Sequence, residues 1–169
     1  MPISHSSLRY AATEPSSALA KSLTEARGLG VRTAFLSHSH HDSALAKGLA
    51  NLLQRQGWRV YIDWTDVSMP ETPNRETASR IQQKIVDLDY FLFLATSNSI
   101  ASRWCPWEIG YADGKKSPDR ILVVITNDGV TTYGNEYLQL YRSVDRTVEG
   151  KLAVWQPGED KNGVLVERL

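Results

Sequence analysis

The sequence predicts an α/β fold of the flavodoxin-like type, a three-layer sandwich in which helices cover both faces of a central parallel β-sheet. Strand-like and amphipathic helical segments alternate along the chain, an order that gives parallel strands joined by right-handed crossovers. The clearest strand is the unbroken apolar run over 89–95. Such a run is typical of a central parallel strand that is covered on both faces. At 169 residues, the chain is long enough to bury one hydrophobic core.

Two strands and a helix form the first part of the predicted domain. Thr33–Ser37 is the first strand, and Trp58–Asp63 is the second. Between them, leucines recur at helical spacing after Asp42 or Ser43, which are residue types that cap helices. This helix closes at Gly57.

Two more strands and two more helical segments follow. Residues 64–74 form a loop that contains two prolines and exceeds the usual length of about two to six residues, and loops this long are often functional. A helix over 76–88 leads into the central strand, and a loop and helix over 97–114 carry Glu108. Arg120–Thr126 is the fourth strand.

The two ends of the chain have weaker patterns. Residues 1–30 are expected to form a loose polar tail of about 14 residues and a short extra helix over 16–27. Residues 31–169 then form a single domain. Within it, 151–156 has the pattern of a short fifth strand, and 134–141 is a helix or an irregular insertion.

Composition excludes several classes of function. Lys plus Arg equals Asp plus Glu at 19 each, and no basic stripe stands out, so nucleic acid is not the expected partner. No apolar run approaches the ~20 residues that span a bilayer, and the N-terminus lacks the order of a signal peptide. Cys105 is the only cysteine, which fits a reducing compartment. We therefore expect a cytoplasmic protein that acts away from membranes.

Polar side chains follow the predicted strands at one edge of the sheet. In open parallel α/β sheets, ligands bind beyond the carboxyl ends of the strands. This rule gathers the ends of the first three strands and the helix after the third around one crevice. The candidate site residues in it are Ser37, His38, Ser39, Asp63, Trp64, Trp104 and Glu108.

Trp104 and Glu108 are four residues apart, so in a helix the indole and the carboxylate lie on the same face. A flat indole beside an acid suits a site that holds a nucleoside and acts on its sugar. Cleavage of a ribosyl bond passes through an oxocarbenium-like state, which one carboxylate can stabilise. Cys105 has no clear base beside it, which argues against a cysteine hydrolase. The alternative interpretation is a core tryptophan near a helix-start glutamate.

These segments together resemble the conserved boxes of the TIR (Toll/interleukin-1 receptor) domain in its bacterial form. The resemblance covers about residues 31–126, with four boxes in the family's order and spacing. Gly134–Tyr141 also looks like a segment of small stand-alone bacterial TIR proteins. The four boxes are Arg32–Asp42, Trp58–Asp63, Asp89–Thr96 and Ser102–Glu108.

The resemblance implies an enzyme that cleaves the bond between nicotinamide and ribose in NAD⁺. Glu108 matches the glutamate that this reaction needs, and Trp104 matches a residue that shapes the pocket. The implied mechanism needs no metal and no further cofactor. NAD⁺ would be consumed as a substrate, because no Gly-rich dinucleotide fingerprint is present.

A stand-alone protein of this size resembles the signal-producing component of Thoeris-type anti-phage systems. The resemblance implies a cyclic ADP-ribose-like messenger that activates a separate effector. It also implies self-association through TIR–TIR contacts, for which the loop over 64–74 is the natural surface.

Several candidate site residues also have a structural interpretation. Ser37 and Ser39 are equally suited to cap the next helix. Asp63 is a common turn-forming residue at the end of a strand, and Trp64 contacts ligand, a neighbouring subunit or the core. His38 either lines the crevice or faces solvent.

The segment from His38 to Asp42 has the H-x-H-x-D pattern of the metallo-β-lactamase zinc site. That family's next histidine is replaced by Ser43, and no histidine follows His41. A catalytic zinc needs three protein ligands and a water, so we do not expect a metal site here.

Two other functions fit the same sequence. A non-enzymatic TIR adaptor would use the loop over 64–74 to bind other TIR domains, and Glu108 would then be a structural acid. A nucleoside deoxyribosyltransferase-like enzyme, a related sandwich with glutamate-assisted chemistry, would consume free nucleosides in place of NAD⁺. The chain also departs from the common TIR pattern, because this loop has no glycine and the segment after Thr126 is longer than a minimal domain needs.

Overall fold

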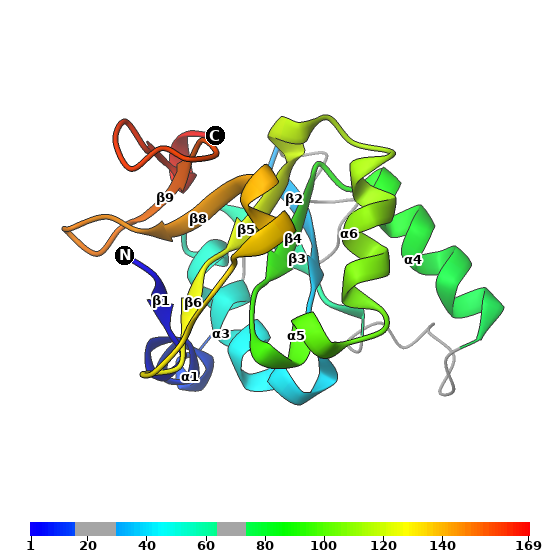
Figure 1. Ribbon diagram of the computed structural model, residues 1–169, viewed down its shortest axis with the longest axis horizontal. Helices are drawn as coiled ribbons and strands as arrows, with labels where there is room; N and C mark the ends of the chain where they lie inside the picture. The colour runs from blue at the N-terminus through cyan, green and yellow to red at the C-terminus, as the bar shows by residue number, and fades with distance from the viewer. Residues whose placement is uncertain (16–29, 64–73) are drawn as a thin grey trace.

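The computed structural model of the chain describes residues 1–15, 30–63 and 74–169. Its central sheet has seven strands: β2 (Arg32–Ser37), β3 (Trp58–Tyr61), β4 (Tyr90–Leu94), β5 (Ile121–Val124), β8 (Arg142–Arg146), β9 (Leu152–Trp155) and β10 (Val164–Leu165). Their order in space is β10-β9-β8-β5-β4-β2-β3. Figure 1 shows the part of this order from β9 through β8 and β5 to β4. Five neighbouring strands, β8, β5, β4, β2 and β3, are parallel, while β9 and β10 run antiparallel to their neighbours. The parallel strands have the flavodoxin-like order, which confirms the predicted fold class.

Helices cover both faces of this sheet (Figure 1). The four longest described helices are α1 (His5–Thr13), α3 (Ser43–Gln54), α4 (Arg75–Asp87) and α6 (Cys105–Asp113). The apolar residues of α1 and α3 pack on one face, and those of α4 and α6 pack on the other. Adjacent residues of β2 supply the two cores, because Leu36 faces α3 and Phe35 faces α4 and α6.

The remaining described elements are short. A second sheet has the order β1-β6-β7 and contains β1 (Ile3–Ser4), β6 (Thr126–Asn127) and β7 (Thr132–Tyr133). The helix α5 spans Ser97–Ala101, and single 3₁₀ turns occupy His40–Asp42, Pro118–Arg120, Glu136–Leu140 and Val166–Arg168. Within the three described ranges, every helix is too short or too polar to cross a membrane.

The first four predicted strands are confirmed, with ends that differ from the observed ones by at most two residues. The helix predicted over 76–88 is α4, which begins after Asn74. The Asn74 side chain accepts hydrogen bonds from the backbone of Glu76 and Thr77, in a capping box. The helical segment predicted within 97–114 is two helices, α5 and α6, with an extended Ser102 between them.

The expected loose tail at the N-terminus is wrong. Ile3 pairs with Thr126 in parallel β structure, and Ile3 and Leu8 are fully buried. Gly48 of α3 lets α1 approach closely, since a Cβ at this position would lie 1.9 Å from the Leu8 carbonyl oxygen. A helix as short as α1 is stabilised by this packing rather than by its own composition, which is why the sequence pattern missed it. The helix expected over 16–27 lies outside the described residues.

The prediction for the C-terminal part was incomplete. The segment expected as a fifth strand is β9, and the parallel strand before it, β8, was missed. In β8 only Val144 is buried, among two arginines, a serine and an aspartate, so the apolar signal of a central strand is absent. The segment 134–141 contains the 3₁₀ turn Glu136–Leu140 and no α-helix.

Candidate active site

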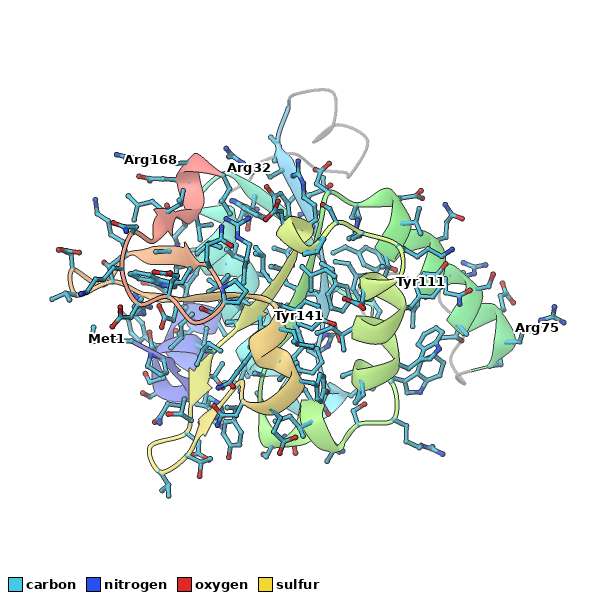
Figure 2. All side chains as sticks on the ribbon, turned by 45° about the horizontal axis from the view of Figure 1, so that its top comes forward. Met1, Arg32, Arg75, Tyr111, Tyr141 and Arg168 are labelled. Atoms are coloured by element: carbon cyan, nitrogen blue, oxygen red, sulfur yellow. The ribbon has the colours of Figure 1, made fainter. Side chains whose placement is uncertain are left out.

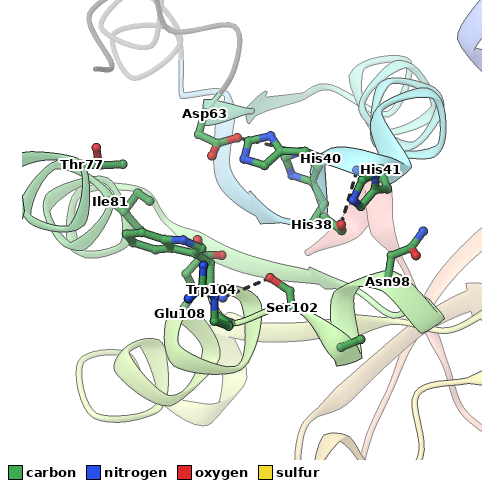
Figure 3. Close-up of a pocket in the computed structure, with 13 residues that line it drawn as sticks. His38, His40, His41, Asp63, Thr77, Ile81, Asn98, Ser102, Trp104 and Glu108 are labelled. Carbon is green, nitrogen blue, oxygen red and sulfur yellow. Dashed lines mark hydrogen bonds and ion pairs between the residues drawn. The ribbon is translucent and has the colours of Figure 1, made fainter. Parts of the chain in front are cut away.

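A pocket of about 410 Å³ opens at the carboxyl ends of β2, β3 and β4, where the fold class predicts a ligand site (Figure 3). One wall comes from the turn after β2, and the other comes from α4, the end of α5 and the start of α6. The lining residues are His38, Ser39, His40, His41, Asp63, Thr77, Ile81, Asn98, Ala101, Ser102, Arg103, Trp104 and Glu108.

Glu108 lies in the first turn of α6, lines the pocket and is only 4% exposed. The Ser37 hydroxyl, at the end of β2, donates a hydrogen bond of 2.6 Å to Glu108 Oε2. The Glu108 backbone N–H donates to the Trp104 carbonyl at 2.8 Å, so the two residues are one helical turn apart, as predicted. The sheet and the helix therefore fix the carboxylate from two sides.

Burial raises the pKa of Glu108 to about 8. The hydrogen bond from Ser37 lowers this pKa, and the nearby charge of Asp63 raises it, but both effects are smaller than that of burial. Glu108 is thus a largely protonated acid at neutral pH. A cation placed beside Glu108 would favour the carboxylate and lower its pKa.

Trp104 is half-buried and stands at the start of α6, on the same wall as Ile81 and Glu108 (Figure 3). Its backbone N–H donates to the Ser102 hydroxyl at 3.1 Å. Its ring meets the Trp107 ring edge to face, with centroids 5.5 Å apart. The indole therefore forms a flat apolar surface beside the buried acid.

His38, Ser39 and Asp63 form the facing wall, as predicted. His38 Nδ1 lies 3.0 Å from the Leu36 carbonyl, which can only accept, so Nδ1 carries the proton. Burial lowers the pKa of His38, which favours the neutral imidazole, and its Nε2 lies 3.9 Å from Asp63 Oδ1. Ser39 lines the pocket and also caps the 3₁₀ turn, because its hydroxyl accepts from the His41 backbone.

Two other candidate residues, Ser37 and Trp64, are not among the described residues that line the pocket. Ser37 is 1% exposed and does not line the pocket, so it is placed to hold Glu108 rather than to touch a ligand. Trp64 lies outside the described residues. Cys105 is buried behind the site, and burial raises the pKa of its thiol to about 12, which leaves it unsuited to nucleophilic catalysis.

A polar network that no sequence pattern predicted lies beside the pocket. Asp42 accepts hydrogen bonds from Thr96 Oγ1 at 2.5 Å and from Asn98 Nδ2 at 2.8 Å. Ser102 and Arg103 also line the pocket. Their only signal in the sequence was a position just after a strand or just before the helix of Glu108. Among the described His, Cys, Asp and Glu side chains, no three converge in a way that could hold a metal ion.

The site combines a buried acid, a flat indole and hydrogen-bonding groups on the opposite wall. A cation or a developing positive charge next to Glu108 would be stabilised when this acid ionises. Neither Ser37 nor Cys105 offers an activated nucleophile, so the arrangement favours stabilisation of charge over formation of a covalent intermediate.

Comparison with known proteins is consistent with this site. The family profile described as TIR domain matches residues 34–152. The chain is 36% identical over 110 residues to a protein of Bacillus cereus (strain MSX-D12) named "Probable 3' cyclic ADP-D-ribose synthase ThsB'". This alignment covers 63% of this chain and 57% of that protein. The chain is also 28% identical over 81 residues to "Putative cyclic ADP-D-ribose synthase TIR2" of Cytobacillus dafuensis. This second alignment covers 46% of this chain and 21% of that protein. The aligned regions thus span less than two thirds of either relative.

Proposed function

Because this chain belongs to the TIR domain family, we propose that it is an enzyme that cleaves the bond between nicotinamide and ribose in NAD⁺ and makes an ADP-ribose-type signal. The names of the two relatives support a cyclic ADP-ribose as the product. The single observation that carries the proposal is the Glu108 carboxyl, which is buried in the pocket wall and held by Ser37.

The reaction would use Glu108 to stabilise positive charge. In NAD⁺ the nicotinamide ring is cationic, and its approach would convert Glu108 to the carboxylate. The electron pair of the ribose–nitrogen bond leaves with nicotinamide, which becomes neutral, and the positive charge passes to the ribose. Glu108 would then stabilise this oxocarbenium-like ribose and accept hydrogen bonds from its hydroxyls.

The second step would decide the product. If water attacks the ribose carbon and loses a proton, the product is ADP-ribose. If a group of the adenosine half attacks instead, the product is a cyclic isomer. The relatives' names favour the cyclic outcome, which would serve as a diffusible signal to a separate effector in anti-phage defence.

Self-association belongs to the same proposal. The loop expected to mediate TIR–TIR contacts lies almost wholly outside the described residues, but it connects Asp63 of the pocket wall to Asn74 at the start of α4. We propose that the assembled enzyme acts in the cytoplasm, where NAD⁺ is available.

The proposal is tested by nicotinamide release from NAD⁺, followed by chromatography with concentrated protein and with lysate from infected cells. Removal of one group that stabilises transition-state charge costs about 10²–10³-fold in rate, so Glu108→Gln should lose at least that much. Glu159→Gln removes an exposed acid and should retain full activity. Mass spectrometry of the product distinguishes ADP-ribose from a cyclic isomer.

Three results would overturn the proposal. Equal nicotinamide release by the wild type and Glu108→Gln would exclude a role for this acid. Absence of release in every condition, together with binding to another TIR domain, would show an adaptor. Consumption of free nucleosides but not of NAD⁺ would instead indicate the deoxyribosyltransferase-like activity.

A further inference from the structure

Arg103 is the one permanently charged cation that the structure places among the described residues lining the pocket. It is exposed and lies just before α6, next to Trp104. Some other arginines in the described part of the chain form ion pairs, such as Arg55 with Glu14. Within the described ranges, Arg103 forms no ion pair with Asp63 or Glu108, the two acids of the pocket. Its guanidinium is therefore available to an anion at the pocket mouth.

Trp107 continues the aromatic surface from the pocket to the outside of α6. It is 37% exposed, and its ring meets the pocket indole of Trp104 at 86° with centroids 5.5 Å apart. One helical turn further along, the Tyr111 ring stacks on Trp107 with centroids 6.1 Å apart, and Lys115 lies over Tyr111 (Figure 2 labels Tyr111). A large exposed indole supported by two other rings is a surface on which a flat base can stack.

The size of the pocket favours a bound dinucleotide that extends beyond it. At about 410 Å³ the pocket is near the lower end of the range of about 300–1,000 Å³ for ligand sites. If the nicotinamide riboside lies between Trp104 and Glu108, the diphosphate and the second base must leave through the mouth. Arg103 is an exposed member of the pocket lining, and Trp107 is the ring that follows Trp104 toward the outside of α6.

We propose that Arg103 binds the diphosphate of the substrate and that Trp107 stacks against its second base. This inference rests on the proposed function and narrows it, because the site would select a dinucleotide over a nicotinamide mononucleotide or riboside. A guanidinium presents paired donors that match phosphate oxygens, which suits Arg103 to this role.

Binding measured without turnover tests the proposal directly. In the Glu108→Gln background, we would titrate NAD⁺, nicotinamide mononucleotide and nicotinamide riboside into the protein by calorimetry. Arg103→Ala should weaken the binding of NAD⁺ about tenfold or more and leave the riboside, which has no phosphate, within about twofold. Trp107→Ala should weaken NAD⁺ about tenfold and leave the mononucleotide, which has no second base, within about twofold.

The exposed pair Arg9 and Tyr10 on α1 provides matched controls, because α1 packs on the opposite face of the sheet. Arg9→Ala and Tyr10→Ala remove the same charge and a similar ring, and should leave all three affinities unchanged. Equal weakening of all three ligands by Arg103→Ala or Trp107→Ala would overturn the proposal and indicate a role in folding or assembly. The proposal would also be overturned if Arg9→Ala and Tyr10→Ala weakened NAD⁺ binding as much as Arg103→Ala and Trp107→Ala do.

Failure of the proposed function has a different signature. In that case the wild type releases no nicotinamide from any of the three compounds. The pattern of affinities still decides the roles of Arg103 and Trp107, because it does not depend on turnover.

Discussion

Glu108 and Asp42 are two buried acids beside the same pocket, but their surroundings differ. Asp42 is 6% exposed and accepts hydrogen bonds on both oxygens, from Thr96 and from Asn98. Glu108 is 4% exposed, and among the described residues Ser37 is its one side-chain donor. The Asp42 carboxyl is occupied by the protein, whereas the Glu108 carboxyl has acceptor capacity left for a ligand.

This difference separates a structural acid from a chemical one. A fully bonded carboxylate fixes loops, here the turn after β2 to the start of α5. A buried carboxyl with few donors stays protonated until a positive charge arrives. The following predictions test this contrast.

The largest expected effect is on the pH dependence of catalysis. Because burial raises the pKa of Glu108 to about 8, kcat/KM for NAD⁺ should rise with pH through this value as the free enzyme ionises. Between pH 8 and pH 6 we expect kcat/KM to fall about 50- to 100-fold. A profile flat across this range, or one that falls above pH 8, would contradict the requirement for a carboxylate at Glu108.

The second effect is the structural cost of losing Asp42. Asp42→Ala leaves the buried Thr96 hydroxyl and the Asn98 amide without their acceptor, and should lower the free energy of unfolding by about 2–3 kcal/mol. Urea denaturation measures this change. The exposed Asp119→Ala is the control and should change stability by less than about 0.5 kcal/mol. If Asp42→Ala were equally mild, Asp42 would not be the structural member of the pair.

The third effect is on the pH dependence of folding stability. The Glu108 carboxyl stabilises the folded protein when it is protonated, whereas Asp42 stabilises it by accepting hydrogen bonds. The folded pKa of about 8 lies above the ordinary value of 4.5, so the folded state binds more protons between these values. Stability from this group is complete below about pH 4.5 and is lost as pH rises through about 8. Relative to Glu108→Gln, the wild type should lose about 2 kcal/mol between pH 6 and pH 8, at about 1.36 kcal/mol per unit.

Urea denaturation of both proteins across this range checks the third prediction. Parallel curves for the wild type and Glu108→Gln would mean that Glu108 is ionised throughout. A charged Glu108 would then be buried without a cost in stability. This result would contradict the proposed difference between Glu108 and Asp42.

The smallest expected effect is a shift in the same catalytic profile. Ser37→Ala removes the hydrogen bond that favours the charged form of Glu108, so the inflection of kcat/KM should move up by about one pH unit. The exposed Ser117→Ala should leave the inflection in place. A direct contact between Ser37 and substrate would instead change KM and leave the inflection unmoved.

Local patterns explain which features the sequence could predict. The central strands and the spacing of Trp104 and Glu108 depend on residues close together in the chain, and the sequence analysis placed them correctly. The role of Ser37 depends on a contact with a residue 71 positions later, which no local pattern contains. Asp42 or Ser43 was expected to cap α3, yet the Asp42 side chain makes no capping bond and instead crosses to Thr96 and Asn98.

The same limit applies to the elements that were missed. The helix α1 depends on the absence of a side chain at Gly48, and β8 depends on its partners β5 and β9 rather than on its own apolar pattern. In both cases stability comes from a distant surface, so composition alone predicts a tail or a loop.

The close approach at Gly48 connects α1 to the end of β4 through a chain of contacts. α1 follows β1, which pairs with β6, and the Thr126 hydroxyl of β6 donates to the Ala95 carbonyl at the end of β4. A methyl group at position 48 would push α1 away and loosen this chain of contacts. Faster hydrogen exchange at Ile3 and Thr126 in Gly48→Ala would report it. An engineer seeking a temperature-sensitive version of the protein could therefore begin at this glycine and leave every ligand-facing side chain intact.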